Sequence, residues 1–421
     1  MTTPIGTRME PAAPARGIRA DRDGLPRLPH RGVRRGGRGG PAARGWGSAA
    51  LGDTEAVPST PFTPNRRRLT ALRLASQHIG ASGLATPGGV VRWMLAMQAQ
   101  DLPGAKWSVG VREPQTSEAA VEAAFDSGEI VRSWPMRGTL HLVSAEDLGW
   151  MLELTAPRAL RSAASRRAAL GIAEADTERA REIAVASLSG GRSLTRAAIL
   201  ASIAAGGVSA EGQRGYHLLW YLAQTGTLVL GAAHGRQQTF TLLDEWVRAP
   251  RRLERDEALG ELAYRYFRSH GPATARDLAR WSGLTMADVK RGLAISGGLL
   301  TQLDLDGVRY HLAPETLAHA PAAARAHLLP GFDEYLLGYQ DRSAALAPEE
   351  SGHVVPGGNG MFKPTVVADG EVVGTWRRTL TAGGVEVEPL LWGPLRGDLR
   401  GALVEAVAAY GAFLGRPARL A

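Results

Sequence analysis

The sequence contains no cysteine among its 421 residues. This absence excludes disulfide bonds, cysteine-ligated zinc, iron–sulfur clusters and thiol catalysis, and it is typical of proteins in a reducing cytoplasm. No apolar run reaches the roughly 18 residues that are needed to span a bilayer. We therefore expect a cytoplasmic chain without a membrane segment.

Several motifs of enzyme chemistry are absent as well. The sequence has no HExxH metal motif and no GxSxG nucleophile elbow, and its ten histidines are scattered along the chain. The glycine-rich stretch 357–360 lacks the Lys-Ser/Thr pair of a phosphate-binding loop, so it indicates a turn. We predict no metal site and no cofactor.

Positive charge is unevenly distributed along the chain. The net charge is +8, and residues 1–60 alone carry ten arginines, no lysine and five acidic residues, which gives +5. The other 361 residues therefore carry only +3. A basic balance favours polyanionic partners. Binding of nucleic acid by the folded part requires its positive charge to gather on one face.

Residues 1–62 are dominated by Gly, Pro, Ala and Arg and show no apolar periodicity, so we predict that they are disordered. Within them, Arg34–Gly40 resembles an RGG segment that can lie on a phosphate backbone. Two explanations are open: a functional tail and an over-extended gene start.

From residue 63 onward the chain predicts helices and short strands in a repeated order. The first pass contains a helix around Leu69–Ile79, a helix over Val90–Met97 capped at Thr86-Pro87, a strand over Trp107–Val111, a helix over Ser117–Asp126, strands over Ile130–Trp134 and Thr139–Val143, and a helix from Ser144. The second pass contains helices over Thr177–Leu188, Ser193–Leu200 and Gly215–Gln224, then strands over Thr227–Leu230 and Gln238–Leu242. The third contains helices over Asp256–Ser269, Ala273–Trp281 and Thr285–Ile295, then a hairpin about Asp306-Gly307, a type I′ turn signal.

Three helices followed by a β-hairpin is the order of a winged helix. The helix starts at Leu194 and Ala273 lie 79 residues apart, which indicates tandem repeats. We predict an α+β fold with three winged-helix domains over 63–175, 176–250 and 251–325, then a β-barrel-like domain over 326–421 with a closing helix. Winged helices usually bind duplex DNA, and the alternative is a use in protein contacts only.

Two glutamines, Gln98 and Gln100, stand two positions apart after an apolar helix. Pro103 disfavours helical angles at the residue before it, so we expect this helix to end between Gln98 and Asp101. In an extended segment residues i and i+2 share a face, so both amides would point into one cleft. The alternative is a pair of solvated glutamines.

A second candidate is the stretch Arg137-Gly138-Thr139-Leu140-His141. If 139–143 is a strand, Leu140 and Leu142 point into the core, and Thr139 and His141 share the solvent side. There they would contact phosphate or hold a water. The alternative is an ordinary polar strand face.

Adjacent carboxylates at Asp333 and Glu334 are a third candidate, with Asp341-Arg342 shortly after them. Paired carboxylates suit acid–base work. We favour a structural interpretation instead, in which they form a loop N-cap and an ion pair organised by Arg342.

Four stretches together resemble the AlkZ-like (AlkZ/YcaQ) winged-helix DNA glycosylase family over roughly residues 65–415. They are Met97–Asp101, Arg137–His141, Leu329–Tyr335 with Asp341-Arg342, and Phe362–Arg377. The resemblance implies a C-shaped chain of tandem winged helices and a β-barrel that embraces double-stranded DNA. It also implies excision of N7-alkylated purines and, in some members, unhooking of interstrand crosslinks, in repair or in antibiotic self-resistance.

The family's catalytic Gln-x-Gln motif maps onto Gln98 and Gln100, whereas the YcaQ branch carries Gln-x-Asp. N7 alkylation makes the purine cationic, so hydrolysis needs only a positioned water and stabilisation of an oxocarbenium-like sugar. A glutamine carbonyl accepts a hydrogen bond from that water, and its NH2 donates one. Two neutral amides would therefore suffice for cationic lesions and fail on neutral bases such as uracil.

Four further residues are assigned by the resemblance to contacts with DNA or the adduct: Arg137, Thr139, His141 and Lys106. We expect no lyase step because no lysine accompanies the glutamine motif. We expect a monomer. The competing hypothesis is a non-catalytic winged-helix regulator or lesion-binding protein, and a weaker one is a relative that has lost activity. A regulator would have no use for the two glutamines.

Overall fold

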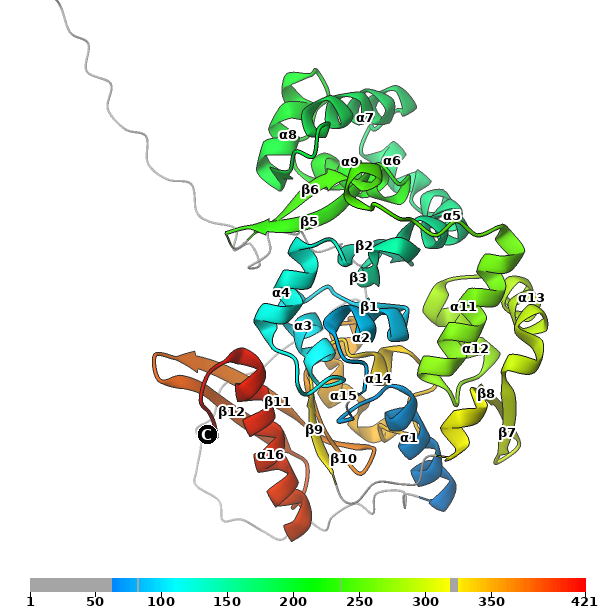
Figure 1. The fold of residues 1–421 in the computed structure, drawn as a ribbon, viewed down its shortest axis with the longest axis vertical. Helices are drawn as coiled ribbons and strands as arrows, with labels where there is room; N and C mark the ends of the chain where they lie inside the picture. Colours follow the sequence, from blue (N-terminus) through cyan, green and yellow to red (C-terminus); the bar gives the residue numbers. More distant parts are fainter. Residues whose placement is uncertain (1–62, 82, 236, 319–324) are drawn as a thin grey trace, which may run out of the picture. The chain divides into compact units, whose positions relative to one another are not determined.

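The computed structural model describes residues 63–81, 83–235, 237–318 and 325–421 of the chain. The tail predicted over residues 1–62 lies outside the described residues. The described part is a mixed α+β fold with sixteen α-helices, a six-stranded sheet, a five-stranded sheet and a two-stranded hairpin (Figure 1). The predicted α+β class is confirmed.

The first segment starts with helices whose N-terminal ends follow local sequence signals. Thr63, Thr86 and Ser117 each accept a hydrogen bond from a backbone N–H of the first turn, as N-cap residues do. The elements are α1 (Pro64–Ser76), α2 (Pro87–Met94), β1 (Ala96–Gln98), α3 (Leu102–Gly110), α4 (Glu118–Asp126), β2 (Ile130–Met136), β3 (Thr139–Ser144) and α5 (Ala145–Ser162).

Two of these elements differ from the sequence prediction. Helix α2 ends at Met94, not near Gln98, because Leu95 has a positive φ of 66° and Ala96 then enters strand β1. Residues 102–110 form helix α3, so the strand predicted over Trp107–Val111 is wrong. The alternating pattern of this segment does not indicate a strand, because residues 107–111 are all buried, whichever way their side chains point. Pro103 begins this helix, where its missing N–H costs nothing.

The second segment adds strands to the same sheet as the first. Its elements are α6 (Ala164–Ala169), α7 (Glu174–Leu188), β4 (Leu194–Thr195), α8 (Arg196–Ala205), α9 (Gln213–Gln224), β5 (Leu228–His234), β6 (Gln237–Leu242) and α10 (Leu243–Trp246). The strand order is β1-β3-β2-β5-β6-β4, and the pairing of Arg132 with Leu230 joins the two segments. Strand β3 therefore lies inside the sheet, between β1 and β2.

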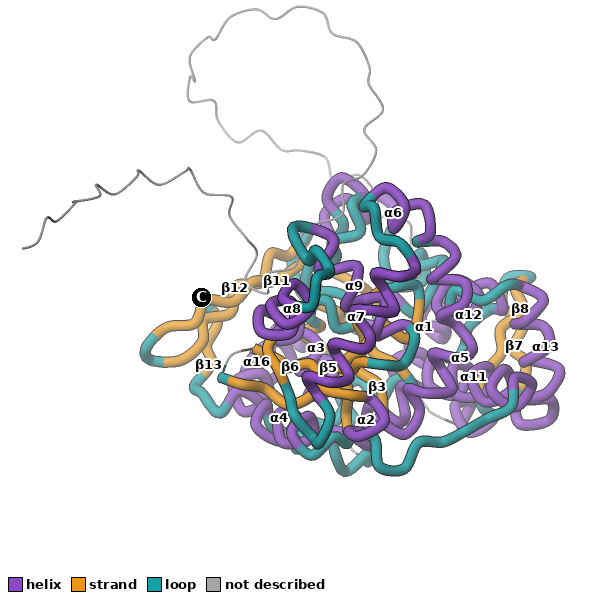
Figure 2. Tube along the Cα trace, turned by 90° about the horizontal axis from the view of Figure 1, so that it is seen from above, coloured by secondary structure: helices purple, strands orange, loops and turns teal. Residues whose placement is uncertain are grey.

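The third segment ends in the predicted separate hairpin. Its elements are α11 (Arg255–His270), α12 (Ala275–Ser282), α13 (Met286–Ser296), η1 (Gly297–Leu299), β7 (Thr301–Leu305), β8 (Val308–Leu312) and η2 (Pro314–Ala318). Asp306 and Gly307 both have positive φ, as a type I′ turn requires. In Figure 2 this hairpin lies beside α13, away from the strands of the two larger sheets.

The C-terminal segment forms a sheet of order β13-β12-β11-β10-β9 and a long closing helix. Its elements are β9 (Ala326–Leu329), α14 (Glu334–Leu337), η3 (Pro348–Glu350), α15 (Ser351–Val354), η4 (Pro356–Gly358), β10 (Thr365–Ala368), β11 (Glu371–Thr381), β12 (Gly384–Leu391), α16 (Gly397–Leu414) and β13 (Ala418–Leu420). The turn at Asp369-Gly370 has two positive φ angles, as a type I′ turn requires.

Two hydrophobic clusters connect segments that are distant in sequence. In the first, Trp107 of α3 contacts the rings of Tyr410 and Phe413 on α16, with centroids 4.9 and 5.2 Å away. In the second, strands β2 and β3 and helix α5 pack against α11, α12 and α13. Burying a large aromatic side chain contributes roughly 2–3 kcal/mol. The β1–β3 strands that carry the candidate residues are thus fixed from both sides.

Candidate active site

The two glutamines lie at the end of strand β1, which pairs with β3 so that Gln98 faces His141. Ala99 between them is fully buried, whereas Gln98 is half-buried and Gln100 is exposed. The chain is therefore extended up to Gln98, where β1 ends, and Gln100 follows in a bend, so the predicted extended segment is confirmed only for the first glutamine. Both side-chain amides hydrogen-bond to the same stretch, residues 137–140 of the β2–β3 hairpin.

Each glutamine oxygen is held by a protein donor. Arg137 Nη2 donates to Gln98 Oε1 at 3.1 Å, and the Leu140 backbone N–H donates to Gln100 Oε1 at 2.8 Å. Both partners are obligate donors, which fixes the orientation of the two amides. Each oxygen keeps a second lone pair, and each NH2 group is available for a substrate or a water.

Arg137 stands at the tip of the hairpin, where Arg137 and Gly138 both have positive φ. It is exposed to solvent and donates to Gln98, while its Nη2 also lies 3.5 Å from His141 Nε2. The Arg137 guanidinium thus binds the glutamine motif and is also accessible to solvent. The structure places it in direct contact with the motif, which the sequence did not indicate.

His141 is fully buried, so the expectation that it lies on a solvent-facing strand side is wrong. Leu140 and Leu142 are buried as predicted, because β3 is an inner strand with both faces covered. The backbone carbonyl of Thr139 can only accept, so His141 Nδ1 donates to it at 2.8 Å. Burial, assisted by the charge of Arg137, lowers the pKa of His141 to about 4. His141 is therefore neutral near pH 7.

Arg132 of β2 supports the main chain of the motif. Its Nε donates to the carbonyl of Ala99 at 2.9 Å, and its Nη2 lies 3.4 Å from the carbonyl of Gln100. Its Nη1 donates to Gln238 on β6 at 3.0 Å. Sequence analysis missed this residue, since nothing local marks a buried arginine that binds carbonyl groups 32 and 33 positions away.

Asp333 caps helix α14 by accepting from the backbone N–H of Tyr335 at 2.9 Å, which confirms the predicted N-cap. The predicted ion pair with Arg342 is wrong. Arg112 forms that pair, with both of its terminal nitrogens 2.8 Å from Asp333 oxygens. Arg342 donates to the carbonyl of Leu336. Arg112 lies in the turn just after α3, and the pairing joins residues 221 positions apart.

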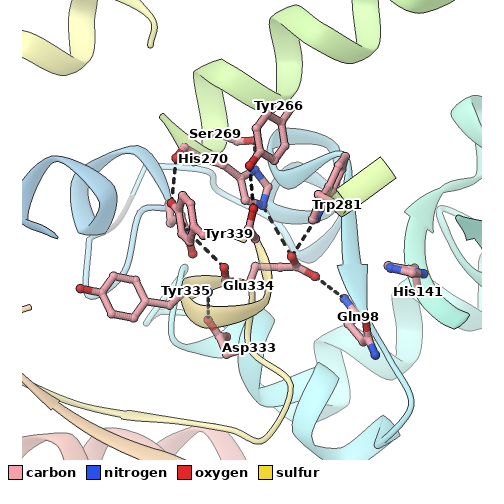
Figure 3. Close-up of polar contacts among 12 residues, drawn as sticks. Gln98, His141, Tyr266, Ser269, His270, Trp281, Asp333, Glu334, Tyr335 and Tyr339 are labelled. Atoms are coloured by element: carbon pink, nitrogen blue, oxygen red, sulfur yellow. Dashed lines mark hydrogen bonds and ion pairs between the residues drawn. The ribbon is translucent and has the colours of Figure 1, made fainter. Parts of the chain in front are cut away.

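Glu334 is buried beside Gln98 (Figure 3). Its Oε1 accepts from the backbone N–H of Gln98 at 2.7 Å, and its Oε2 accepts from Trp281 Nε1 at 2.9 Å. His270 Nε2 lies 3.7 Å from Oε2. Burial alone would raise the pKa of Glu334, but its interaction with His270, with smaller interactions with His141 and Arg137, outweighs burial and lowers the pKa to about 2. Glu334 is thus a carboxylate at neutral pH.

Thr139 and Lys106, the remaining predicted contact residues, have other local partners. Thr139 is half-buried and its hydroxyl donates to the carbonyl of Met136 at 3.4 Å. The ammonium of Lys106 pairs with Glu118 and Glu122 on helix α4. Neither side chain forms a hydrogen bond with the glutamines.

Within the described residues, no group of three or more His, Asp or Glu side chains is arranged to hold a metal ion. No helix in the same ranges has the length and apolar character needed to cross a membrane.

A family model described as "DNA glycosylase AlkZ-like" matches residues 91–413, which is well over half of the chain. The chain belongs to this family, and the enzyme class predicted from the sequence, a DNA glycosylase, is confirmed. The chain is 29% identical over 327 residues to a curated protein from Streptomyces sahachiroi, "Interstrand DNA cross-link repair glycosylase", over 74% of this chain and 87% of that one. The solved structure of Streptomyces sahachiroi DNA glycosylase AlkZ matches with a TM-score of 0.71 and 26% identity, and the match covers 84% of this chain and 99% of that chain.

Proposed function

We propose that this chain is a monofunctional DNA glycosylase that hydrolyses the N-glycosidic bond of N7-alkylated purines in duplex DNA. One observation carries the proposal: both glutamine amides are oriented by protein donors, while Gln98 is only half-buried and Gln100 is exposed. A pre-oriented pair of neutral acceptors and donors suits a reaction whose leaving group is already cationic.

The proposed reaction needs only a water and the two amides. The water donates a hydrogen bond to a glutamine oxygen, which directs the oxygen of the water at C1′ of the sugar. The C1′–N9 bond breaks, and its electron pair neutralises the cationic purine. The oxygen of the water bonds to C1′, and its proton passes to solvent. A neutral base would leave as an anion, for which these residues offer no acid.

Contacts with DNA fall to the exposed part of the site. We assign Arg137 to a phosphate or adduct contact, because it is a solvent-exposed cation beside Gln98. Thr139, half-buried on the same hairpin, is the second such contact. His141 has no exposed surface, so we assign it to the support of Arg137 rather than to direct contact. Lys106 remains a candidate phosphate contact that would first have to leave Glu118 and Glu122.

The helix–helix–helix–hairpin order supports three winged-helix domains over 63–175, 176–250 and 251–325, with a β-barrel-like domain over 326–421. Their third helices differ in charge. Helix α4 carries only acidic charges, Glu118, Glu122 and Asp126, whereas α13 presents the exposed cations Lys290 and Arg291. Unlike third helices favour a monomer that embraces one lesion in a C-shaped arrangement over a symmetric dimer on a palindrome.

Crosslinked purines are the second proposed substrate. The curated relative is named for repair of interstrand crosslinks, and the alignment covers 87% of it. We propose that this chain releases N7-linked crosslinks as well as single adducts, in repair or in self-resistance to a crosslinking agent, on cytoplasmic DNA.

The test uses three duplexes that carry N7-methylguanine, a nitrogen-mustard interstrand crosslink, or uracil. We expect abasic sites from the first two and none from uracil, and no strand cleavage before alkali is added. Release of uracil would contradict the neutral-amide mechanism. Tight binding without release from any duplex would favour the alternative, a non-catalytic winged-helix DNA-binding protein.

A further inference from the structure

Two neighbouring carboxylates at the start of α14 are both buried and have different partners. Asp333 is paired with Arg112 through two contacts of 2.8 Å and accepts from Ser108 Oγ at 2.6 Å. Glu334 accepts instead from Gln98 and Trp281 (Figure 3). One carboxylate fastens α14 to α3, and the other touches the glutamine motif.

The charge of Glu334 has no directly bonded cation that would make it a simple structural ion pair. Among the residues that the structure describes, no lysine or arginine forms an ion pair with it, and its nearest basic group is His270 at 3.7 Å. Burial of a carboxylate is costly unless it is paired and hydrogen-bonded. The two Glu334 oxygens each accept one N–H bond, whereas the amide of a glutamine has a single acceptor oxygen and would turn its NH2 group toward one of the two donors. The carboxylate supplies both acceptors, and its negative charge also acts on the groups around Gln98.

That charge faces the groups that orient Gln98. The exposed Arg137 guanidinium and the buried His141 both interact with it electrostatically. Glu334 thus acts on Gln98 from two directions: it holds the backbone N–H directly, and it attracts the Arg137 cation that binds the side-chain oxygen. Hydrogen bonds to an ionised acceptor are about twice as strong as neutral ones.

Glu334 also connects three distant segments to the motif. Gln98 belongs to β1, Trp281 to α12, and His270 to the end of α11. The His270 ring stacks on Tyr266, with centroids 4.8 Å apart and an interplanar angle of 12°, and its Nδ1 lies 2.9 Å from Ser269 Oγ. The side chains around the Glu334 carboxylate are therefore buried and packed against one another.

We propose that Glu334 is a positioning residue for the glycosylase reaction, whose negative charge fixes Gln98 in its productive orientation. This inference rests on the proposed function, since it assigns Gln98 to the reacting water. It predicts that the charge matters beyond the shape of the side chain. It also predicts that the adjacent Asp333 does not matter in this way.

The experiment compares Glu334→Gln with Asp333→Asn in the full chain, using single-turnover release of N7-methylguanine. We expect Glu334→Gln to lower the single-turnover rate about 10- to 100-fold, with the DNA dissociation constant unchanged within about twofold. Glu334→Asp, which keeps the charge, should recover part of the rate. Asp333→Asn should lower the melting temperature and leave the rate of the folded protein within about twofold, because its partners are structural.

The outcomes separate the role of Glu334 from the proposed function. An unchanged rate in Glu334→Gln, or an equal loss in folded Asp333→Asn, would overturn the role of Glu334 and leave the glycosylase intact. No release by the wild type would instead overturn the proposed function itself. If Glu334→Gln does not fold, Trp281→Phe removes one donor from the same carboxylate and should lower the rate by severalfold. An unchanged rate in that variant would also overturn the proposal.

Discussion

The surroundings of Gln98 and of Gln100 differ in kind. Gln98 is bound by side chains: the buried carboxylate of Glu334 accepts from its backbone N–H, and the exposed Arg137 donates to its side-chain oxygen. Arg137 in turn lies close to the buried His141. Gln100 is held by the main chain: its oxygen accepts from the Leu140 N–H, and its own carbonyl lies near Arg132. One glutamine depends on side chains from distant segments, and the other on the backbone of the neighbouring strand.

The supports of the two glutamines therefore differ in whether a mutation can remove them. Every support of the Gln98 amide is a side chain that can be replaced, whereas the donor to Gln100 is a peptide N–H that follows from strand pairing. We therefore expect the Gln98 side to tune the rate through charge, and the Gln100 side to be robust as long as the β1–β3 pairing persists.

The largest effects are expected from the glutamines themselves. Gln98→Ala and Gln100→Ala each remove a group that is oriented before substrate arrives, and each should lower the single-turnover rate about 100- to 1,000-fold, as loss of one preorganised donor does elsewhere. DNA affinity should change by less than about threefold. The measurement is base release at saturating enzyme, with binding followed separately by fluorescence anisotropy. A variant that retains the wild-type rate would remove that glutamine from the reaction.

A smaller loss is expected at Arg137, which serves both Gln98 and, in our proposal, DNA. Arg137→Met should lower the rate about 10- to 100-fold and reduce the slope of log affinity against log salt by about 1, since one phosphate contact disappears. Arg137→Lys is the matched control. It should recover the salt slope but not the full rate, because an ammonium cannot reproduce the guanidinium geometry. Full recovery of the rate by lysine would show that charge alone suffices.

On the Gln100 side, Arg132→Met removes donors to the carbonyls of Ala99 and Gln100. Leaving a buried carbonyl without its donor costs about 1–3 kcal/mol, so we expect the free energy of unfolding to fall by that amount. The rate should fall by about tenfold or less. Gln238→Ala removes only the third partner of Arg132 and should change both quantities little. Urea unfolding and single-turnover release measure the two effects, and equal losses in both variants would contradict the assignment.

The smallest effect on rate is expected from pH, because the titratable groups beside Gln98 have pKa values far from neutrality. The pKa of Glu334 is lowered to about 2 and that of His141 to about 4, so neither changes charge between pH 6 and 9. We expect a flat single-turnover rate over this range. A bell-shaped profile centred near pH 7 would assign the reaction to a group other than the two amides.

Stability should depend on pH even where the rate does not. The folded-state pKa of His141 lies below the value of about 6.5 in an unfolded chain, so the unfolded state binds more protons between the two values. Stability is therefore complete above pH 6.5 and falls as the pH drops toward 4, by roughly 3 kcal/mol for this group. His141→Asn should reduce that fall. His327, whose pKa is also lowered to about 4 by burial, is common to both proteins and serves as the internal reference.

Local signals predicted much of the fold. The N-cap at Thr86 and the type I′ turn at Asp306-Gly307 each depend on a few adjacent residues, and the structure confirms them. Helix α3 was missed for a physical reason: an alternating pattern marks a strand only when one face is exposed, and residues 107–111 are buried throughout.

The supports of the site were less predictable. Glu334 binds Gln98 across 236 positions, and Arg112 binds Asp333 across 221. Which of two adjacent carboxylates faces the motif is decided by packing of α3, α12 and α14, not by local sequence. His141 was expected to face solvent because the sequence does not show that both faces of β3 are covered, so that Leu140–Ser144 are all buried. The resemblance of residues 329–335 to the family was the signal that pointed to this region.

The most direct test of the central claim compares the wild type with the Gln98→Ala/Gln100→Ala double variant on one duplex that carries N7-methylguanine, by counting abasic sites at saturating enzyme. We predict release by the wild type and loss of release in a double variant that still binds the duplex and melts cooperatively. Release by the double variant at the wild-type rate would contradict the account and place the reaction elsewhere on the chain.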